Sequence, residues 1–492
     1  MPKVRFWAFS TTTTTFNTMN LYWFRTDLRL TDNTALYHAT QDDVSIALFI
    51  ITPQQWLQHH DAPCKIDFYL RQLKTLSHHL QQLNIPLLIR YCDFWHEIPV
   101  LLLDLCQSFN INKVYCNQEY GIHEQQRDNA TLNLLQQHSI DFLSYQDKLI
   151  FTPGTIKNKT AEYYKVFSAF KQICYENIYA QEIYFKTNPA PKKQTLTHIN
   201  SDPIPDAVIG FENTSPNIQQ QWQVGEKNAW LKLDQFIDEH INQYHLGRDY
   251  PARGATSQLS PYLNAGVLSI RQCLQAARIN TEGTLPSNNN GVNTWFDEVL
   301  WREFYTHILY GFPHISRHQP FKTAFKHIAW RTAPDDLYAW QHGLTGFPII
   351  DAAMRQLLAT GWMHNRLRMI VAMFLCKNLL IDWRHGEKWF MQHLIDGDLA
   401  ANNGGWQWCA STGTDSVPYF RIFNPITQSK KFDPEGQFIR SWLPALAHLD
   451  HKAIHEPYKY LKHGDKLDYP QPMIDLKLSR NRAIAAFQKV KA

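Results

Sequence analysis

The sequence lacks the patterns typical of metal-binding, disulfide-stabilised and membrane-spanning proteins. Its eight cysteines are scattered over 492 residues, and neither CxxC nor HExxH spacing occurs. No apolar run is long enough to cross a bilayer. These absences predict no metal site, no disulfide framework and no membrane partner. Unpaired cysteines favour a reducing compartment, so we expect a cytoplasmic protein.

Strong charge and a standard dinucleotide motif are also missing. The formal net charge of +4 is too small to predict a nucleic-acid partner unless the basic residues are clustered. No GxGxxG follows the first predicted strand, so the usual dinucleotide-binding loop is absent. Aromatic residues, in contrast, are abundant, with 16 Trp among them. The length of 492 residues exceeds what one hydrophobic core normally supports, which predicts two domains.

The two halves of the chain have different hydrophobic periods. Between residues 20 and 150, short apolar runs alternate with helical patterns, which predicts a doubly wound, Rossmann-like α/β domain with a parallel sheet. The expected helices include 64–83, 97–109 and 123–138, and the expected strands are 21–25, 45–51, 86–91, 113–116 and 141–145. From about residue 228, apolar residues recur at helical spacing, which predicts an all-α domain.

These patterns predict four segments along the chain: an unstructured tail (1–18), an α/β domain (19–150), a connector (151–227) and a helical domain (228–492). A start of translation at Met19, directly before the first strand, would agree with this division. Composition further predicts a surface loop over 281–293 and an irregular segment over 445–470.

The segment 396–415, DGDLAANNGGWQWCASTGTD, has no hydrophobic period. It combines two carboxylates, paired Asn, paired Gly and two Trp. These residues supply hydrogen-bond acceptors, amides, close backbone approach and flat aromatic faces. We therefore expect a loop-rich segment that lines a pocket for a planar ligand with polar edges.

Two further motifs are ambiguous by themselves. In GATSQLSP (254–261), Ser260 as N-cap and Pro261 at the first helical position favour a helix start, with exposed amides that suit an anion. From this motif alone, an ordinary capped helix is favoured over a phosphate site. GWMHNRLRM (361–369) alone would pass for a helix with a basic outer face.

A predicted helix places four polar and aromatic residues on one face, namely Glu298, Trp301, Arg302 and Tyr305. Such a face fits either a cavity wall or a surface Glu298–Arg302 pair beside a packed Trp, and the spacing does not decide between them. Trp330, Trp383 and Trp406 would individually be assigned to the core.

Taken in order, the motifs resemble the photolyase/cryptochrome family, and within it the class I cyclobutane pyrimidine dimer (CPD) DNA photolyases. The similarity covers nearly the whole chain from Met19. Its most specific matches are WFRTDLRLTDN, TSQLSP, LWREFY, TGFPIIDAAMRQLLATGWMHNRLRM, LLIDWRHGE, DGDLAANNGGWQWCASTGTD and PYFRIFNP. The resemblance implies an N-terminal α/β domain and an all-α FAD-binding domain that holds the cofactor as FADH⁻.

The resemblance also implies which residues contact FAD. The phosphates and ribityl chain would contact Tyr244, Thr256, Ser257, Leu259 and Ser260, and the same cavity would include Trp295, Glu298 and Arg302. The isoalloxazine ring would contact Arg368, Asp396, Asp398 and, at its N5, Asn402. An Asn amide there stabilises reduced flavin without adding a charge.

The implied substrate is DNA with a pyrimidine dimer, which must flip out of the duplex to reach a buried flavin. The catalytic pocket would contain Glu298, Asn402, Trp301, Trp408, Asn365 and Met369. DNA contacts would come from Arg248, Trp301, Asn365, Arg366, Trp408 and Arg421, with the arginines on phosphates. Electrons that reduce FAD would pass along Trp330, Trp383 and Trp406.

The implied reaction is light-dependent dimer repair by electron transfer from excited FADH⁻ and return of that electron, in a monomeric protein. (6-4) photolyases carry a His pair where Asn365 and Met369 stand, which favours cyclobutane dimers. The alternative is a cryptochrome-type blue-light photoreceptor, and a generic flavin oxidoreductase ranks last.

A second, antenna chromophore is also implied, and methenyltetrahydrofolate is the first expectation. Relatives that bind folate use an acidic residue and a Lys where this chain has Gly121 and Arg317, and Glu119 and Glu124 are candidates to compensate. A deazaflavin, or no antenna, are the alternatives.

Overall fold

A five-stranded parallel sheet forms the centre of the N-terminal half, in the order β3-β2-β1-β4-β5. The structure is a computed structural model and describes residues 19–491 except 42–43, 181–187, 196–197, 213, 282, 284 and 462–465, so the predicted tail 1–18 lies outside the described residues. All five predicted strands are confirmed to within two residues at each end: β1 (Met19–Phe24), β2 (Ser45–Ile51), β3 (Leu87–Tyr91), β4 (Ile111–Asn117) and β5 (Asp141–Tyr145).

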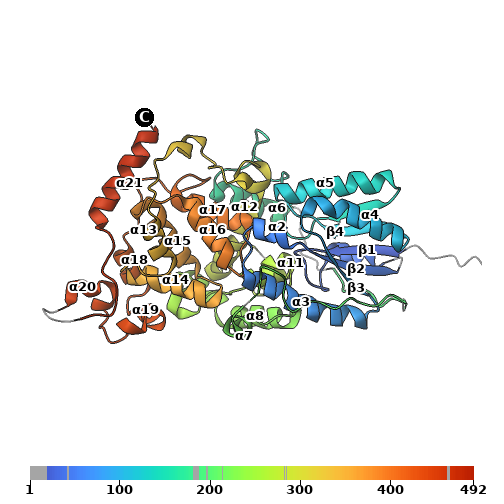
Figure 1. Ribbon diagram of the computed structural model, residues 1–492, viewed down its shortest axis with the longest axis horizontal. Coiled ribbons are helices and arrows are strands. Elements are labelled where there is room, and N and C mark those ends of the chain that lie inside the picture. Colours follow the sequence, from blue (N-terminus) through green and yellow to red (C-terminus); the bar gives the residue numbers. More distant parts are fainter. Residues whose placement is uncertain are drawn as a thin grey trace, which may run out of the picture.

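Helices cover both faces of this sheet, as the doubly wound prediction requires. Leu21 and Trp23 of β1 pack in one apolar cluster with residues of α4 (Ile98–Ser108) and α5 (Ile122–Gln137). Tyr22 and Phe24 point to the opposite face. There they pack with residues of α1 (Thr34–Ala39) and α3 (Pro63–Gln82). Figure 1 shows α4 and α5 on one side of the sheet and α3 on the other.

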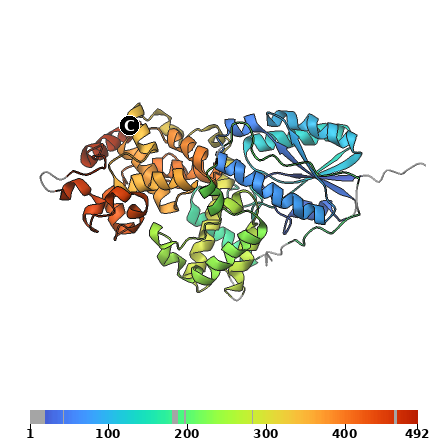
Figure 2. The same cartoon turned by 60° about the horizontal axis from the view of Figure 1, so that its bottom comes forward.

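The C-terminal half is helical and lies beside the sheet lobe (Figure 2). The fold class is therefore confirmed: a parallel α/β lobe followed by an all-α lobe. The main helices are α8 (Glu226–Glu239), α11 (Ile270–Ile279), α12 (Asn290–Gly311), α14 (Pro348–Thr360), α15 (Asn365–Met373), α16 (Trp383–His393) and α17 (Leu399–Ala410). Shorter or peripheral helices are α2 (Pro53–Gln58), α9 (Tyr244–Gly247), α10 (Ser260–Asn264), α13 (Pro334–Gln341), α18 (Pro425–Phe432), α19 (Gln437–Trp442), α20 (Pro457–Tyr460) and α21 (Leu476–Lys491).

The predicted connector 151–227 contains two helices. α6 (Phe167–Ala180) packs on α12, where the rings of Phe167 and Trp301 stack with centroids 3.7 Å apart. α7 (Pro216–Gln221) follows later in the same stretch. The structure therefore joins part of this segment to the helical lobe.

Three local predictions were wrong. The segment 396–415 is mostly the helix α17. Asp398 caps this helix by accepting a hydrogen bond from the backbone N–H of Ala401 at 2.9 Å, and the apolar residues of the helix pack in the helical core. The loop expected over 281–293 ends earlier, since Asn289 caps α12 and the helix begins at Asn290. The apolar stripe at helical spacing in LRMIVAMFLCKNLLIDW (367–383) predicts a continuous helix, but α15 ends in a π-helical turn, Phe374–Asn378, and α16 begins only at Trp383.

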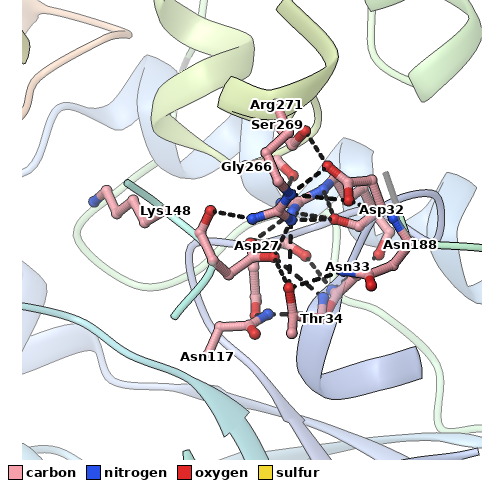
Figure 3. Close-up of polar contacts among 12 residues, drawn as sticks. Asp27, Asp32, Asn33, Thr34, Asn117, Lys148, Asn188, Gly266, Ser269 and Arg271 are labelled. Atoms are coloured by element: carbon pink, nitrogen blue, oxygen red, sulfur yellow. Dashed lines mark hydrogen bonds and ion pairs between the residues drawn. The ribbon is translucent and has the colours of Figure 1, made fainter. Parts of the chain in front are cut away.

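Buried charges join the two lobes. Asp147, at the end of the sheet lobe, accepts hydrogen bonds from Arg29 at 2.5 Å and from Arg271 of α11 at 2.6 Å. Asp32 pairs with the same Arg271 at 3.0 Å, and Figure 3 shows Asp32, Ser269 and Arg271 directed toward one another. Arg29 and Asp147 pair within the sheet lobe, and Arg271 of the helical lobe compensates the charge of Asp32 and adds a second partner for Asp147.

The lobe backbones touch beside this network. Gly266 has a φ of +68°, and a Cβ at this position would lie 2.2 Å from the carbonyl oxygen of Thr26 in the other lobe. Only glycine fits both the left-handed conformation and the close approach. The carbonyl of Gly266 accepts a further hydrogen bond from Arg29 at 3.1 Å.

The eight cysteines are all free thiols, and seven of them are buried. No helix among the described residues has the length and apolar character needed to cross a membrane.

Replacing Arg271 with Met should destabilise the protein by about 3–5 kcal/mol, because Asp32 and Asp147 would lose a buried partner. Urea unfolding followed by tryptophan fluorescence measures the change. Lys74→Gln, which breaks an exposed pair with Asp206, is the control and should leave the unfolding midpoint nearly unchanged. Equal midpoints for Arg271→Met and the native protein would show that the network does not hold the lobes together.

Candidate functional site

A cavity of about 510 Å³ lies between α10, α12, α15 and α17 of the helical lobe. Its size is within the range of small-molecule and cofactor sites. The sequence-predicted residues that line it are Tyr244, Arg248, Ser257, Leu259, Ser260, Trp295, Glu298, Trp301, Arg302, Asn365, Arg366, Arg368, Met369, Asp396, Asp398, Asn402, Trp406 and Trp408. Thr256, Trp330, Trp383 and Arg421 are not among the lining residues.

One face of α12 forms a wall of this cavity. Glu298, Trp301, Arg302 and Tyr305 all line it, so the cavity-wall alternative is correct. Glu298 does not pair with Arg302, as the surface alternative required. Its carboxylate instead binds Arg248 at 2.6 Å, while Arg302 donates to the backbone carbonyl of Lys148 at 2.9 Å.

Ser260 has a different role from the predicted N-cap. The cap residue of α10 is Leu259, and Ser260 is the first residue of the helix. Its hydroxyl donates to Asp396 at 2.6 Å, because the chain segment before α17 lies directly beside α10. Arg368 binds both oxygens of Asp396, at 3.1 and 2.8 Å. A buried carboxylate is therefore compensated on two sides at the cavity wall.

Asp398 and Asn402 lie one turn apart at the start of α17. Burial raises the pKa of Asp398, but Lys148 and Arg302 more than offset this effect, so its pKa is below the ordinary value and it stays ionised. The side-chain nitrogen of Asn402 donates to the carbonyl of Glu387 at 2.9 Å. The amide oxygen of Asn402 is therefore the atom that remains available to accept a hydrogen bond in the cavity.

Two adjacent glycines, Gly404 and Gly405, explain how α17 packs against α12 and beside the cavity. A Cβ at Gly404 would lie 2.2 Å from the ring of Tyr305, so glycine lets α17 approach α12. A Cβ at Gly405 would meet no atom within 4 Å, and Gly405 lines the cavity. The second glycine thus leaves space for a ligand rather than for a neighbouring helix.

Two ion pairs lie near one another at the cavity. Arg248 pairs with Glu298, and Arg366 pairs with Asp249 at 2.7 Å. The guanidinium of Arg366 also lies over the ring of Phe432, 4.4 Å from its centroid. Burial raises the pKa of Glu298, and the Arg248 guanidinium offsets this effect only in part.

The three predicted relay tryptophans belong to one hydrophobic cluster. Trp406 lines the cavity and is buried, Trp383 is buried behind it, and Trp330 is half-buried. Gly386 of α16 lies against the ring of Trp406, since a Cβ there would approach it to 2.1 Å. Trp406 and Trp383 are thus both buried, and Trp330 is the most exposed of the three.

The loop after β4 has an unusual carboxylate. A Cβ at Gly121 would lie 2.1 Å from Oε2 of Glu124, so Glu124 fills the space that a side chain at 121 would take. Burial and the nearby Glu119 raise the pKa of Glu124 to about 7. Glu119 itself accepts hydrogen bonds from the hydroxyl of Thr26 at 2.6 Å and from the guanidinium of Arg127 at 2.9 Å. Glu124 is thus the carboxylate that this loop leaves free of an ion pair among the described residues.

Some lining residues were missed from the sequence. Asn264 lies one helical turn after Ser260 and could have been found by that spacing. It donates to the carbonyl of Gly397 at 2.9 Å. Cys409 also lines the cavity and lies in the segment 396–415 that was expected to do so, whereas Phe390 had no such signal.

The donor set of the cavity fits a flavin dinucleotide. Hydroxyls of Ser257 and Ser260 and the guanidinium of Arg302 suit phosphates and a polyol chain, while the amide oxygen of Asn402 suits a ring N–H. The open space over Gly405 accepts a planar ring. These features define a two-lobed protein with a large cofactor site inside its helical lobe.

Comparison with known proteins identifies the family. The model described as "FAD binding domain of DNA photolyase" matches residues 295–489, and that described as "DNA photolyase" matches residues 20–192. The chain is 44% identical to the deoxyribodipyrimidine photo-lyase of Buchnera aphidicola, over 96% of this chain and 97% of the relative. It is 42% identical to that of Escherichia coli, over 96% and 98% of the two chains. The chain belongs to the DNA photolyase family, and its helical lobe is the FAD-binding domain.

Solved structures agree with this assignment. A bacterial class III photolyase from Agrobacterium tumefaciens has a TM-score of 0.85 at 34% identity, covering 98% of this chain and 99% of the other. A cryptochrome from Synechocystis has a TM-score of 0.81 at 26% identity, covering 95% and 99%. The fold is therefore common to both branches of the family.

Replacing Gly405 with Ala tests the cavity directly. The apoprotein should gain about 0.5–1 kcal/mol, since Ala replaces Gly in a helix without a clash, yet FAD content should fall because the methyl group occupies ligand space. Thermal unfolding of the apoprotein and flavin absorbance of the purified protein measure the two effects. Gly386→Ala is the contrasting variant and should destabilise the apoprotein, because its methyl group meets Trp406. Native FAD content in Gly405→Ala would contradict the assignment.

Proposed function

We propose that this protein repairs cyclobutane pyrimidine dimers in DNA when it absorbs blue light. One observation carries the proposal: residues suited to a flavin and residues suited to a flipped dimer line the same cavity. Asn402, Asp396 and Arg368 represent the first group, and Trp301 and Trp408 represent the second. A single cavity holds cofactor and lesion close together, which favours fast electron transfer between them.

When bound, reduced FAD supplies an electron to the dimer on absorbing light and takes it back after the two bonds between the pyrimidine rings have broken. The protein's own residues bind, orient and exclude water. Trp301 is held by stacking on Phe167, with an angle of 12° between the rings, so its free face is fixed for the dimer. The carboxylate of Glu298 accepts a hydrogen bond from an N–H at the base edge, and the amide oxygen of Asn402 accepts one from a ring N–H of the flavin.

DNA binding rests on the arginines. Arg248 and Arg366 lie at the cavity, and Arg421 is exposed outside it. Contacts from these side chains to phosphates give affinity without sequence preference, and salt weakens them. Asn365 and Met369 line the pocket without a titratable group, which supports cyclobutane dimers as substrate rather than (6-4) products.

Three finer assignments belong to the same proposal. The protein acts as a monomer in the cytoplasm. Methenyltetrahydrofolate serves as antenna, with Glu124 replacing the acidic residue that Gly121 lacks. Burial lowers the pKa of His123, the neighbour of Glu124, and the positive charge of Arg317 lowers it further, which supports a cation of the helical lobe near the same place.

The proposed repair is tested with a dimer-containing oligonucleotide and reduced, FAD-loaded protein. Blue light should restore the dimers to pyrimidines, and Glu298→Ala should lower the yield by about tenfold or more while FAD is retained, because a hydrogen bond to a charged group is lost. Asp297→Ala, at the preceding position of α12 and outside the cavity, is the control. Absence of repair by reduced, FAD-loaded protein would overturn the proposal and favour a cryptochrome-type photoreceptor, whose fold this chain shares.

The proposed relay is tested with Trp330→Phe. Photoreduction of oxidised FAD should be blocked, because the half-buried outer tryptophan is the one that external reductants reach. Repair by chemically reduced enzyme should continue, since that step does not use the relay. Flavin absorbance during illumination follows the first reaction, and unimpaired photoreduction would remove Trp330 from the relay.

A further inference from the structure

The ion pair between Arg248 and Glu298 has a feature that the proposed function does not explain. Arg248 follows α9, and Glu298 lies on α12, 50 positions further along the chain, yet both line the cavity and their side chains meet at 2.6 Å. One residue is proposed to bind a DNA phosphate and the other a flipped base. In the free protein, Arg248 therefore occupies the carboxylate that the flipped base needs, and Glu298 occupies the guanidinium that the DNA phosphate needs.

Glu298 depends on this one cation. Within the described chain, Arg248 is the only Lys, Arg or His within 4 Å of the Glu298 carboxylate. The surrounding carboxylates, Asp297 and Asp249, disfavour its charge further, and its side chain is only 28% exposed. If Arg248 bound another anion instead, the half-buried carboxylate of Glu298 would lose the positive charge that compensates it, which is unfavourable.

Two ligands must consequently arrive together. A phosphate that binds Arg248 displaces Glu298, and only an N–H donor inside the cavity then satisfies the released carboxylate. A flipped pyrimidine dimer brings such a donor, because its rings carry imide N–H groups. An undamaged duplex brings the phosphate alone, since its bases remain stacked and paired.

We propose that the Arg248–Glu298 pair acts as a gate that opens only when two groups bind together, a DNA phosphate and a flipped base. Arg248 then contacts a phosphate only when a base occupies the cavity. This inference rests on the proposed function. It assigns to Glu298 a role in specificity before any light is absorbed: the carboxylate withholds Arg248 from undamaged DNA. The neighbouring Arg366–Asp249 pair lacks this property, because Asp249 is more exposed, at 37%, and water compensates it when it is released.

The gate is tested by binding in the dark to an undamaged duplex. Each phosphate contact steepens the dependence of log K on log salt by about 0.9, which is about 3.5-fold in affinity between 50 and 200 mM KCl. In Glu298→Gln, Arg248 loses its close charged partner at 2.6 Å and keeps only the longer contact with Asp249 at 3.9 Å, while the shape of the side chain at position 298 is kept. The slope for undamaged DNA should therefore steepen by about 0.9 relative to the native protein, and the preference for dimer-containing DNA should fall.

Two variants identify the cause of this change. Glu298→Gln combined with Arg248→Gln should return the slope to the native value, because the released cation is gone. Asp297→Asn removes one negative charge from the adjacent position of α12, where it pairs with Lys171 rather than Arg248, and should leave the slope unchanged. FAD content confirms that each variant is folded.

Several outcomes overturn the gate. They are an unchanged slope in Glu298→Gln, a steeper slope that persists without Arg248, or an equal change in Asp297→Asn, which would reflect net charge alone. Because undamaged DNA in the dark undergoes no repair, these outcomes are independent of whether the protein repairs dimers. A native protein that bound neither DNA would contradict the proposed function and the gate together.

Discussion

The arrangement of the whole molecule depends on one buried carboxylate, Asp147, held between an arginine from each lobe. Burial would raise its pKa, but Arg29 and Arg271 lower it far below the ordinary value, so the group is charged and its partners are fixed. The next residue extends this constraint to the cavity. The backbone carbonyl of Lys148 accepts a hydrogen bond from Arg302, and the ammonium of Lys148 lies 3.8 Å from the carboxylate of Asp398. The lobe junction, drawn in Figure 3, is thus linked through Lys148 to the charged residues of the cofactor site.

The same principle of compensation governs the cavity itself. Each carboxylate at its wall has a named partner: Asp396 has Arg368 and Ser260, and Glu298 has Arg248. The pairs differ in what they allow. Asp396 is buried and bound on two sides, which suits a fixed wall for a cofactor. Glu298 has one partner at the edge of the cavity, which suits a group that changes partners when DNA arrives.

Much of the fold could be predicted from local sequence patterns. The strands of the sheet lobe and most of the long helices lie where the short apolar runs and the helical period place them, because each pattern is set by residues within a few positions. The face of α12 was correctly grouped for the same reason. The chemistry of the site was also recognisable, since Asn, Gly and Trp occur together in 396–415 for no reason of secondary structure. Its conformation was predicted wrongly, because Asp398 supplies a cap and Tyr305 requires the glycine that composition alone assigns to a loop.

By itself, then, the sequence determined the two lobes, the helical faces and the kinds of side chain that the site contains. Only the tertiary structure decided which of those side chains meet. Ser260 binds Asp396 across 136 positions of the chain, and Glu298 pairs with Arg248 rather than with Arg302 one turn away. The physical reason is that a buried charge takes whatever partner the packing of distant elements brings within reach, and no local period encodes that choice.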